Sequence, residues 1–259
     1  MVFEINFRGE YIMIRENIVP FEAGTIKSSN EYLFLKKFEE NMDLFKKAYE
    51  FCEDEDFLHE MKEVSGENQV QNNSWHIFPL YSNRNLDFYI DYLSEKLSVD
   101  VRRIIEVLRS NLPDTYEFLD EVIEENGIIN LWFSRLKAQS TIKCHINNDP
   151  FQYRGHIGLQ VPKGNVCLKV KDSIVRWRED RFFVFDTTEP HMAWNLTDED
   201  RVVMSVDFFR EPRQEMMRLH EERIRNKIKN TPLGFEGGYL ALDPKLVDRF
   251  NNVIEEVSY

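Results

Sequence analysis

A mainly β core of the sandwich or jelly-roll type, with α-helices flanking it on its N- and C-terminal sides, is the fold that this sequence predicts. Short runs rich in Ile, Val, Phe and Trp follow one another between residues 128 and 209, separated by turn-forming residues. Amphipathic helical periodicity lies before and after this region. A chain of 259 residues accommodates one such domain with additions.

Six strands are expected in the core, at residues 128–136, 156–161, 166–170, 174–177, 182–185 and 201–209. Residues 162–165 (Pro-Lys-Gly-Asn) and 171–173 (Lys-Asp-Ser) have the composition of hairpin turns. An aromatic run at residues 75–81 predicts a further strand ahead of the six. Short antiparallel strands at this spacing are typical of sandwiches and jelly rolls.

Helices are expected on both sides of the strands. Apolar residues recur at three- and four-residue steps over residues 31–51, which predicts a helix beginning at Ser29 or Asn30. Residues 86–125 show the same periodicity with a break near Pro113, where Asp114 is a candidate N-cap. Further helices are expected beyond Pro212. The predicted organisation is an N-terminal helical extension (1–70), a core (71–210) and a C-terminal helical extension (211–259).

Charge and composition exclude several classes of protein. The 33 basic and 46 acidic residues give a formal net charge of −13, which argues against nucleic-acid binding. No run reaches the ~18 apolar residues of a membrane span, and the charged N-terminal residues cannot form a signal-peptide core. A cytoplasmic protein with no membrane anchor is therefore expected. Cys52, Cys144 and Cys167 have no CxxC spacing and are expected to be reduced and mostly buried.

Two histidines and an arginine in the strand-rich region give the first indication of chemistry. His145 follows one strand, His191 follows another, and Arg201 opens the next. Both histidines lie where a jelly roll places ligands at its open mouth. Neutral imidazoles bind Fe(II), and the fixed fork of an arginine suits a carboxylate. This combination is what a non-heme Fe(II) oxygenase using 2-oxoglutarate needs. By spacing alone, two histidines 46 residues apart in a β region are more often core or surface residues than metal ligands.

Several ordered motifs carry a resemblance to a known family. They are residues 154–162 (Arg-Gly-His-Ile-Gly-Leu-Gln-Val-Pro), 176–180 (Arg-Trp-Arg-Glu-Asp), 185–195 and 201–207, with Trp132-Phe133-Ser134 and His145 at matching spacing. The stretch from about residue 75 to residue 209 resembles the aspartyl/asparaginyl β-hydroxylase family of Fe(II)- and 2-oxoglutarate-dependent dioxygenases. The resemblance implies that the jelly roll is a cupin-like double-stranded β-helix.

The resemblance also implies which residues form the site. The two metal ligands would be His145 and His191. The residues that bind 2-oxoglutarate would be Ser134, Arg154, His156 and Arg201. Arg201, with a hydrogen bond from Ser134, would hold the distal carboxylate, whereas His156 and Arg154 would lie near the carboxylate beside the keto group. Arg154 is also a catalytic candidate with the two metal ligands, because it can face the substrate instead.

The activity implied is hydroxylation of a side-chain carbon, the β-carbon by preference, in an amino acid or a peptide residue such as Asp or Asn. Fe(II) would be held at the site, 2-oxoglutarate and O2 would be consumed, and succinate and CO2 would be released. The expected partner is an amino-acid, peptide or carrier-bound amino-acid substrate, and the oligomeric state stays open. Trp177 and Trp194 are expected to be packing residues.

Two departures from the family pattern, at Asn147 and Gln152, keep alternatives open. Asn147 stands where a facial triad has its carboxylate, so Asn147, water or Asp186 would complete the metal site, although Asp186 is better placed to cap a turn. A site without a carboxylate also suits a related 2-oxoglutarate-dependent halogenase. Gln152 stands where members that bind an aspartyl side chain have a second arginine. A non-catalytic jelly-roll binding protein is the alternative from another class.

The other histidines are expected to be structural or solvated. His59 lies beside an acidic run and His220 in a charged helix, so both are expected at the surface. His76, on the early strand, is expected to be structural. Strand alternation places Arg135 on the face opposite Ser134, where solvated charge is the default.

Overall fold

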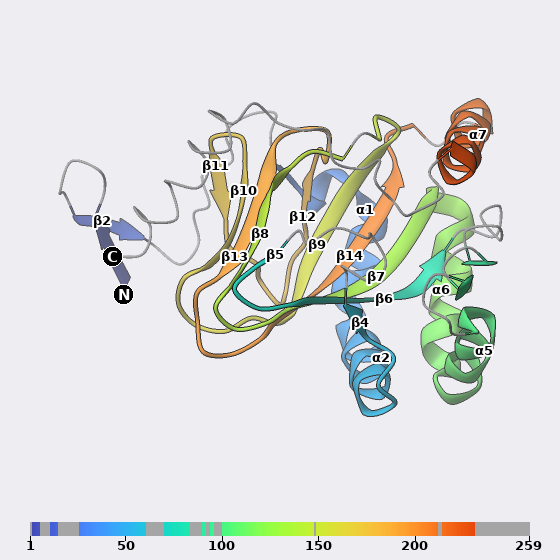
Figure 1. Cartoon of the computed structure of the whole chain (residues 1–259), viewed down its shortest axis with the longest axis horizontal. Helices are drawn as coiled ribbons and strands as arrows, with labels where there is room; N and C mark the ends of the chain where they lie inside the picture. Colours follow the sequence, from blue (N-terminus) through green and yellow to red (C-terminus); the bar gives the residue numbers. More distant parts are fainter. Residues whose placement is uncertain are drawn as a thin grey trace.

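Two antiparallel sheets form the core of the molecule (Figure 1). The computed structural model describes residues 2–5, 11–14, 26–60, 70–82, 90–91, 94–95, 100–147, 149–211 and 214–230. The larger sheet has the order β3 (Ile26–Ser28), β12 (Phe183–Phe185), β9 (Gln152–Gln160), β14 (Arg201–Phe209), β7 (Ile128–Leu136), β6 (Trp75–Ser82) and β4 (His59–Glu60). The smaller sheet has the order β11 (Ser173–Val175), β10 (Val166–Val170), β13 (His191–Asn195), β8 (Ser140–His145) and β5 (Val70–Gln71).

The two sheets pack face to face through one apolar layer. Leu136 and Val203 of the larger sheet share a buried cluster with Ile142, Leu168 and Ala193 of the smaller one. Alternation along β14 then places Arg201 and Asp207 on the same inner face as Val203, because these residues are separated by even numbers. The fold is therefore mainly β and of the predicted jelly-roll class, and its inner layer carries charged side chains.

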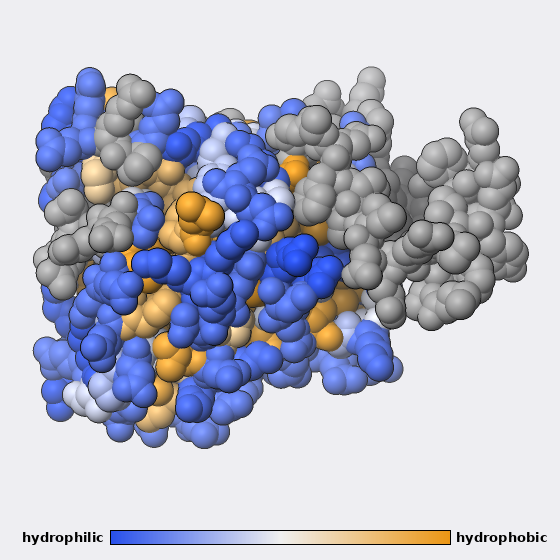
Figure 2. Space-filling view, turned by 180° about the vertical axis from the view of Figure 1, so that it is seen from behind, coloured by the Kyte–Doolittle hydropathy of each residue, from blue (hydrophilic) through white to orange (hydrophobic). Residues whose placement is uncertain are grey.

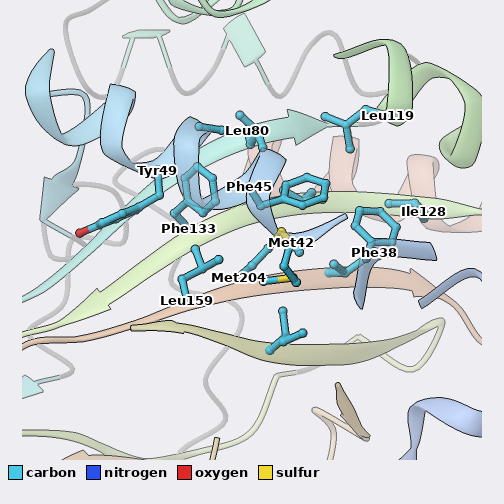
Figure 3. Packing of buried hydrophobic residues seen from close by; sticks show 14 of the residues in the cluster. Phe38, Met42, Phe45, Tyr49, Leu80, Leu119, Ile128, Phe133, Leu159 and Met204 are labelled. Carbon is cyan, nitrogen blue, oxygen red and sulfur yellow. The ribbon is translucent and has the colours of Figure 1, made fainter. Parts of the chain in front are cut away.

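A second apolar layer lies between the larger sheet and the helices. The helices are α1 (Leu33–Glu40), α2 (Met42–Asp54), α5 (Val101–Asn111) and α6 (Pro113–Asn126). Figure 3 shows Phe38, Phe45 and Leu119 from the helices against Phe133 and Met204 of the sheet. Burying one face of each helix covers the outer side of this sheet.

The helix boundaries differ from the predicted ones for local reasons. The helix expected over residues 31–51 is divided at Asn41, whose backbone (φ −118°, ψ 26°) leaves the helical region between α1 and α2. A 3-10 helix, η1 (Ser29–Glu31), precedes it. Pro113 is the first residue of α6, as its fixed φ favours. The predicted Asp114 cap is wrong, because Leu112 holds the N-cap position and Asp114 lies in the first turn.

The C-terminal described helix, α7 (Gln214–Asn230), packs on the end of the core. The prediction of a solvated His220 is wrong, since this residue is only 3% exposed. Its Nε2 lies 3.1 Å from Asp149 Oδ2, and its ring meets those of Phe151 and Phe209 edge-on. Two of the charged neighbours that suggested exposure, Arg218 and Glu222, pair with each other at the surface.

The three cysteines, Cys52, Cys144 and Cys167, are free thiols and buried, as predicted. The surface seen from behind is mainly hydrophilic, with smaller apolar areas between (Figure 2). Among the described residues, no helix is both long and apolar enough to cross a membrane. A short two-stranded sheet consists of β1 (Val2–Ile5) and β2 (Tyr11–Ile14), and the last predicted helix, ending near residue 257, lies outside the described residues.

Candidate active site

His145 and His191 lie side by side on neighbouring strands. His145 is the last residue of β8, His191 is the first of β13, and the two are direct cross-strand partners. Their ring centroids are 4.2 Å apart, and the residues are 8% and 4% exposed. The structure therefore brings together two imidazoles that are 46 residues apart in the sequence.

A β-bulge in β8 turns His145 into the interior. The pairing steps from His191–His145 to Ala193–Ile142, so Lys143 and Cys144 stand opposite Met192 alone. Ile142 faces the layer between the sheets, and a regular strand would turn the residue three positions later to the opposite face. The extra residue reverses that outcome, as bulges beside functional sites often do.

Both imidazoles are held in the same tautomer. Nδ1 of His145 lies 2.7 Å from the carbonyl oxygen of Lys143, and Nδ1 of His191 lies 2.8 Å from that of Glu189. A carbonyl oxygen only accepts hydrogen bonds, so Nδ1 carries the proton and the lone pair is on Nε2. Burial lowers the pKa of His191 to about 4. Burial and repulsion by His191 lower that of His145 well below its usual range. Both rings are neutral at physiological pH, which is the form that binds a metal.

Arg201 is a deeply buried cation. It is 1% exposed, and its guanidinium carbon lies 4.6 Å from the ring centroid of Trp177. Among the described residues, neither Nε nor Nη2 has a hydrogen-bond partner. Burial lowers the pKa of Arg201 to about 9, so the side chain still carries its charge at neutral pH. An anionic ligand would supply the partner that a buried guanidinium requires.

Ser134 is prepared to donate a hydrogen bond in the same layer. Its Oγ accepts from Trp75 Nε1 at 2.8 Å, and the serine is 6% exposed. Because the indole occupies one acceptor position, the hydroxyl proton is directed away from Trp75. Trp75 is thus a supporting residue that the sequence interpretation did not single out.

His156 has the opposite tautomer from the two paired histidines. Its Nδ1 accepts a hydrogen bond from Trp177 Nε1 at 3.3 Å, which leaves the proton on Nε2. Burial, followed by the charges of Arg154 and Arg201, lowers the pKa of His156 well below its usual range. His156 is therefore a neutral hydrogen-bond donor. Trp177 does more than pack, because it orients His156 and lies against Arg201.

Arg154 is paired with Asp207 on the inner face of the larger sheet. Its Nε lies 2.6 Å from Oδ1 and its Nη2 lies 2.9 Å from Oδ2 of Asp207. The guanidinium carbon also lies 4.7 Å from the ring centroid of Trp132. The sequence interpretation gave Asp207 no role. Its even spacing from Arg201 in an otherwise apolar strand is the signal that would have identified it.

The two candidate third ligands, Asp186 and Asn147, are each hydrogen-bonded to the turn at residues 187–188. Asp186 accepts from the backbone N–H and the hydroxyl of Thr188 and pairs with Arg210, so it caps a turn as predicted. Asn147 is tied through its backbone N–H to the carbonyl oxygen of Thr187 at 2.7 Å. In the part of the chain that the structure describes, no third His, Cys, Asp or Glu joins the pair in a metal-binding cluster.

The chain is similar in sequence to a known hydroxylase, and solved oxygenase structures align with it at low sequence identity. It is 29% identical over 127 residues to an ornithine lipid ester-linked acyl 2-hydroxylase of Rhizobium tropici; the match covers 48% of this chain but only 44% of that relative. A prolyl-4-hydroxylase structure from Pseudomonas putida aligns with a TM-score of 0.37 and 12% identity, covering 65% and 87% of the two chains. A 2OG-Fe(II) oxygenase family structure from Burkholderia pseudomallei aligns with a TM-score of 0.34 and 11% identity, covering 60% and 74%.

The family model matches a long continuous stretch, which includes every residue of the site. It spans residues 39–211, from α1 through β14. The motifs carry the resemblance only from about residue 75 to residue 209. The matched range begins earlier because it includes α2, which packs on the larger sheet. The chain belongs to the aspartyl/asparaginyl β-hydroxylase family.

Proposed function

We propose that this protein is an Fe(II)- and 2-oxoglutarate-dependent dioxygenase that hydroxylates a carbon of an organic substrate. The observation that carries the proposal is the combination of two Nε2 lone pairs in one buried pair of imidazoles with a buried arginine that has no carboxylate partner among the described residues. The first suits a metal ion and the second suits the distal end of a dicarboxylate. A binding protein without turnover gives no physical reason to retain both.

His145 and His191 would hold Fe(II) through Nε2, and their Nδ1 hydrogen bonds fix the direction of each ring. Arg201 and the hydroxyl of Ser134 would bind the distal carboxylate of 2-oxoglutarate. His156, as a donor through Nε2, and Arg154 would bind the carboxylate beside the keto group. Bound Fe(II) and 2-oxoglutarate supply the O2 activation that hydroxylates the substrate and releases succinate and CO2.

The protein's own contribution is orientation and exclusion of water. The rings and guanidinium groups lie between two packed sheets, where Phe185 lies 5.5 Å from the ring of His191 and 5.1 Å from that of His156. Asn147 follows His145 closely in the chain and would occupy the position of the missing carboxylate or hold a water there. Electrostatic interactions of buried groups such as these are stronger than the same interactions in water.

The proposed substrate is an amino-acid side chain, free, in a peptide or bound to a carrier, with reaction at the β-carbon. A second candidate is the acyl chain of an amino-acid-containing lipid, which the similarity to the ornithine lipid acyl 2-hydroxylase favours. Gln152, where aspartyl-binding members are expected to have arginine, disfavours an aspartate side chain within the first class.

Succinate formation tests the activity. The Fe(II)-loaded protein, supplied with 2-oxoglutarate, O2 and panels of peptides, amino acids and ornithine lipids, is expected to form succinate and a product heavier by one oxygen atom. His191→Ala should abolish both. A chlorinated product with chloride present would identify the halogenase alternative. A metal-loaded wild type that neither binds nor consumes 2-oxoglutarate would refute the proposal and leave the non-catalytic alternative.

A further inference from the structure

The Arg154–Asp207 pair is buried on the inner face of the larger sheet. Asp207 is 2% exposed and Arg154 is 9% exposed, and their two short hydrogen bonds are parallel and bidentate. A buried pair of this kind costs desolvation, which the attraction between the charges only partly repays. A functional reason for the pair is therefore worth seeking.

Three restraints act on the Arg154 side chain. Arg154 and Asp207 are direct cross-strand partners on β9 and β14, so the sheet register fixes their backbones. The bidentate bonds use Nε and Nη2 and so fix the guanidinium plane and the direction of Nη1. The Trp132 ring lies 4.7 Å from the guanidinium carbon and limits its movement on one side. A long, flexible arginine side chain is held in one orientation.

That orientation places the charge of Arg154 beside the histidines. Arg154 is the cross-strand partner of Phe185, whose ring lies 5.1 Å from that of His156 and 5.5 Å from that of His191. The carboxylate of Asp207 balances this charge within the apolar layer. The pair thus presents a directed N–H donor to the pocket while adding no net charge to it.

We propose that Asp207 is a positioning residue, which holds Arg154 so that Nη1 meets the carboxylate beside the keto group of 2-oxoglutarate. The inference rests on the proposed function, because it needs 2-oxoglutarate to bind between Arg154 and the histidine pair. Asp207 touches neither ligand nor metal in this arrangement and acts through Arg154 alone.

The first test measures 2-oxoglutarate binding by calorimetry to the Mn(II)-substituted protein, which separates binding from turnover. Asp207→Asn keeps the shape of the side chain but removes the charge, and is expected to weaken binding about tenfold. In the Fe(II) enzyme it should also lower the ratio of product to succinate, because a misplaced cosubstrate is consumed without hydroxylation. Asp180→Asn is the matched control, since Asp180 makes the same bidentate contacts with Arg178 at the surface. Its binding should match the wild type.

A double-mutant cycle tests whether Asp207 acts through Arg154. If it does, Asp207→Asn combined with Arg154→Gln should bind 2-oxoglutarate no more weakly than Arg154→Gln alone. Additive losses would overturn the proposal, and so would unchanged binding in Asp207→Asn. If Asp207→Asn does not fold, Asp207→Glu retains the charge but displaces the guanidinium by one methylene. An unchanged dissociation constant in that variant would also overturn it. Failure of wild-type protein to bind 2-oxoglutarate would instead refute the proposed function.

Discussion

Three neighbouring histidines, His145, His191 and His156, differ in the ring nitrogen that carries the proton. His145 and His191 have the proton on Nδ1, whereas Trp177 holds His156 with the proton on Nε2. The sequence could identify these residues through motif and spacing. It could not predict the tautomers, because these depend on carbonyl groups and an indole that the fold brings to each ring. The structure thus shows that His145 and His191 offer a lone pair on Nε2, whereas His156 offers an N–H on Nε2.

Arg201 is expected to favour binding at the expense of stability. A buried charge without a carboxylate partner destabilises the folded state, so Arg201→Met should unfold at a higher urea concentration, with a gain of about 1 kcal/mol in the metal-free protein. The same variant should lose 2-oxoglutarate affinity by roughly 100-fold, since a charge-assisted contact is lost. Urea denaturation and calorimetry on one preparation measure both.

A gain in stability together with a loss of 2-oxoglutarate affinity is the result expected if Arg201 is a ligand-binding residue. Arg178→Met is a suitable control, because Arg178 is half-exposed and already paired with Asp180. It should change neither quantity appreciably. An Arg201→Met protein that is less stable and binds 2-oxoglutarate normally would show that Arg201 is a structural residue.

At the scale of elements, the two strands that carry the histidine pair are among those that the sequence did not predict. Neither β8 (Ser140–His145) nor β13 (His191–Asn195) has a long apolar run or a clean alternation. Their strand character comes from pairing with each other and with β10. In contrast, β7 was predicted with its observed limits and β14 likewise, because apolar residues dominate both. A bulge depends on register, which a single sequence does not reveal.

The helix α7 is expected to depend on His220 for its attachment. His220→Ala removes ring contacts with Phe151 and Phe209 and leaves the carboxylate of Asp149 without this partner. Burial acts to raise the pKa of Asp149, but the hydrogen bond and charge of His220 outweigh it, so the pKa lies below its usual value. The substitution should lower the free energy of unfolding by about 2–4 kcal/mol.

Chemical denaturation of matched variants checks this expectation. Arg218→Ala lies on the same helix and breaks only an exposed pair with Glu222, so its effect should stay within about 0.5 kcal/mol. Equal stability of the two variants would mean that α7 is held mainly by other contacts. The misinterpretation of His220 has a clear cause, because helical charge patterning does not show which face meets Phe209.

At the scale of the whole molecule, a chain with a net charge of −13 has an inner layer that holds neutral imidazoles, the balanced Arg154–Asp207 pair and the buried cation Arg201. Composition argues against nucleic acid as a partner but could not show this arrangement of charges. The jelly-roll class followed from the spacing of strands, whereas the placement of Arg154, Arg201 and Asp207 on one inner face followed from pairing between distant strands. Pairing between distant strands also brings the histidines together. Their burial there makes the stability of the protein depend on pH.

The metal-free protein is expected to lose stability as the pH falls from about 6.5 to 4. His145, His156 and His191 have lowered pKa values in the folded state, so the unfolded chain binds protons that the folded protein does not. Their contribution is fully present above pH 6.5 and decreases as the pH falls, by about 1.4 kcal/mol per pH unit for each histidine. For His191, whose pKa is about 4, the total is about 3 kcal/mol. Asp149 acts in the same direction only below its usual value of 3.8. Urea denaturation across this range, after removal of metal with a chelator, measures the slope. His156→Asn should reduce the slope by about 1.4 kcal/mol per pH unit, which is the contribution of one histidine. A slope that this variant leaves unchanged would show that His156 is not neutral in the folded protein.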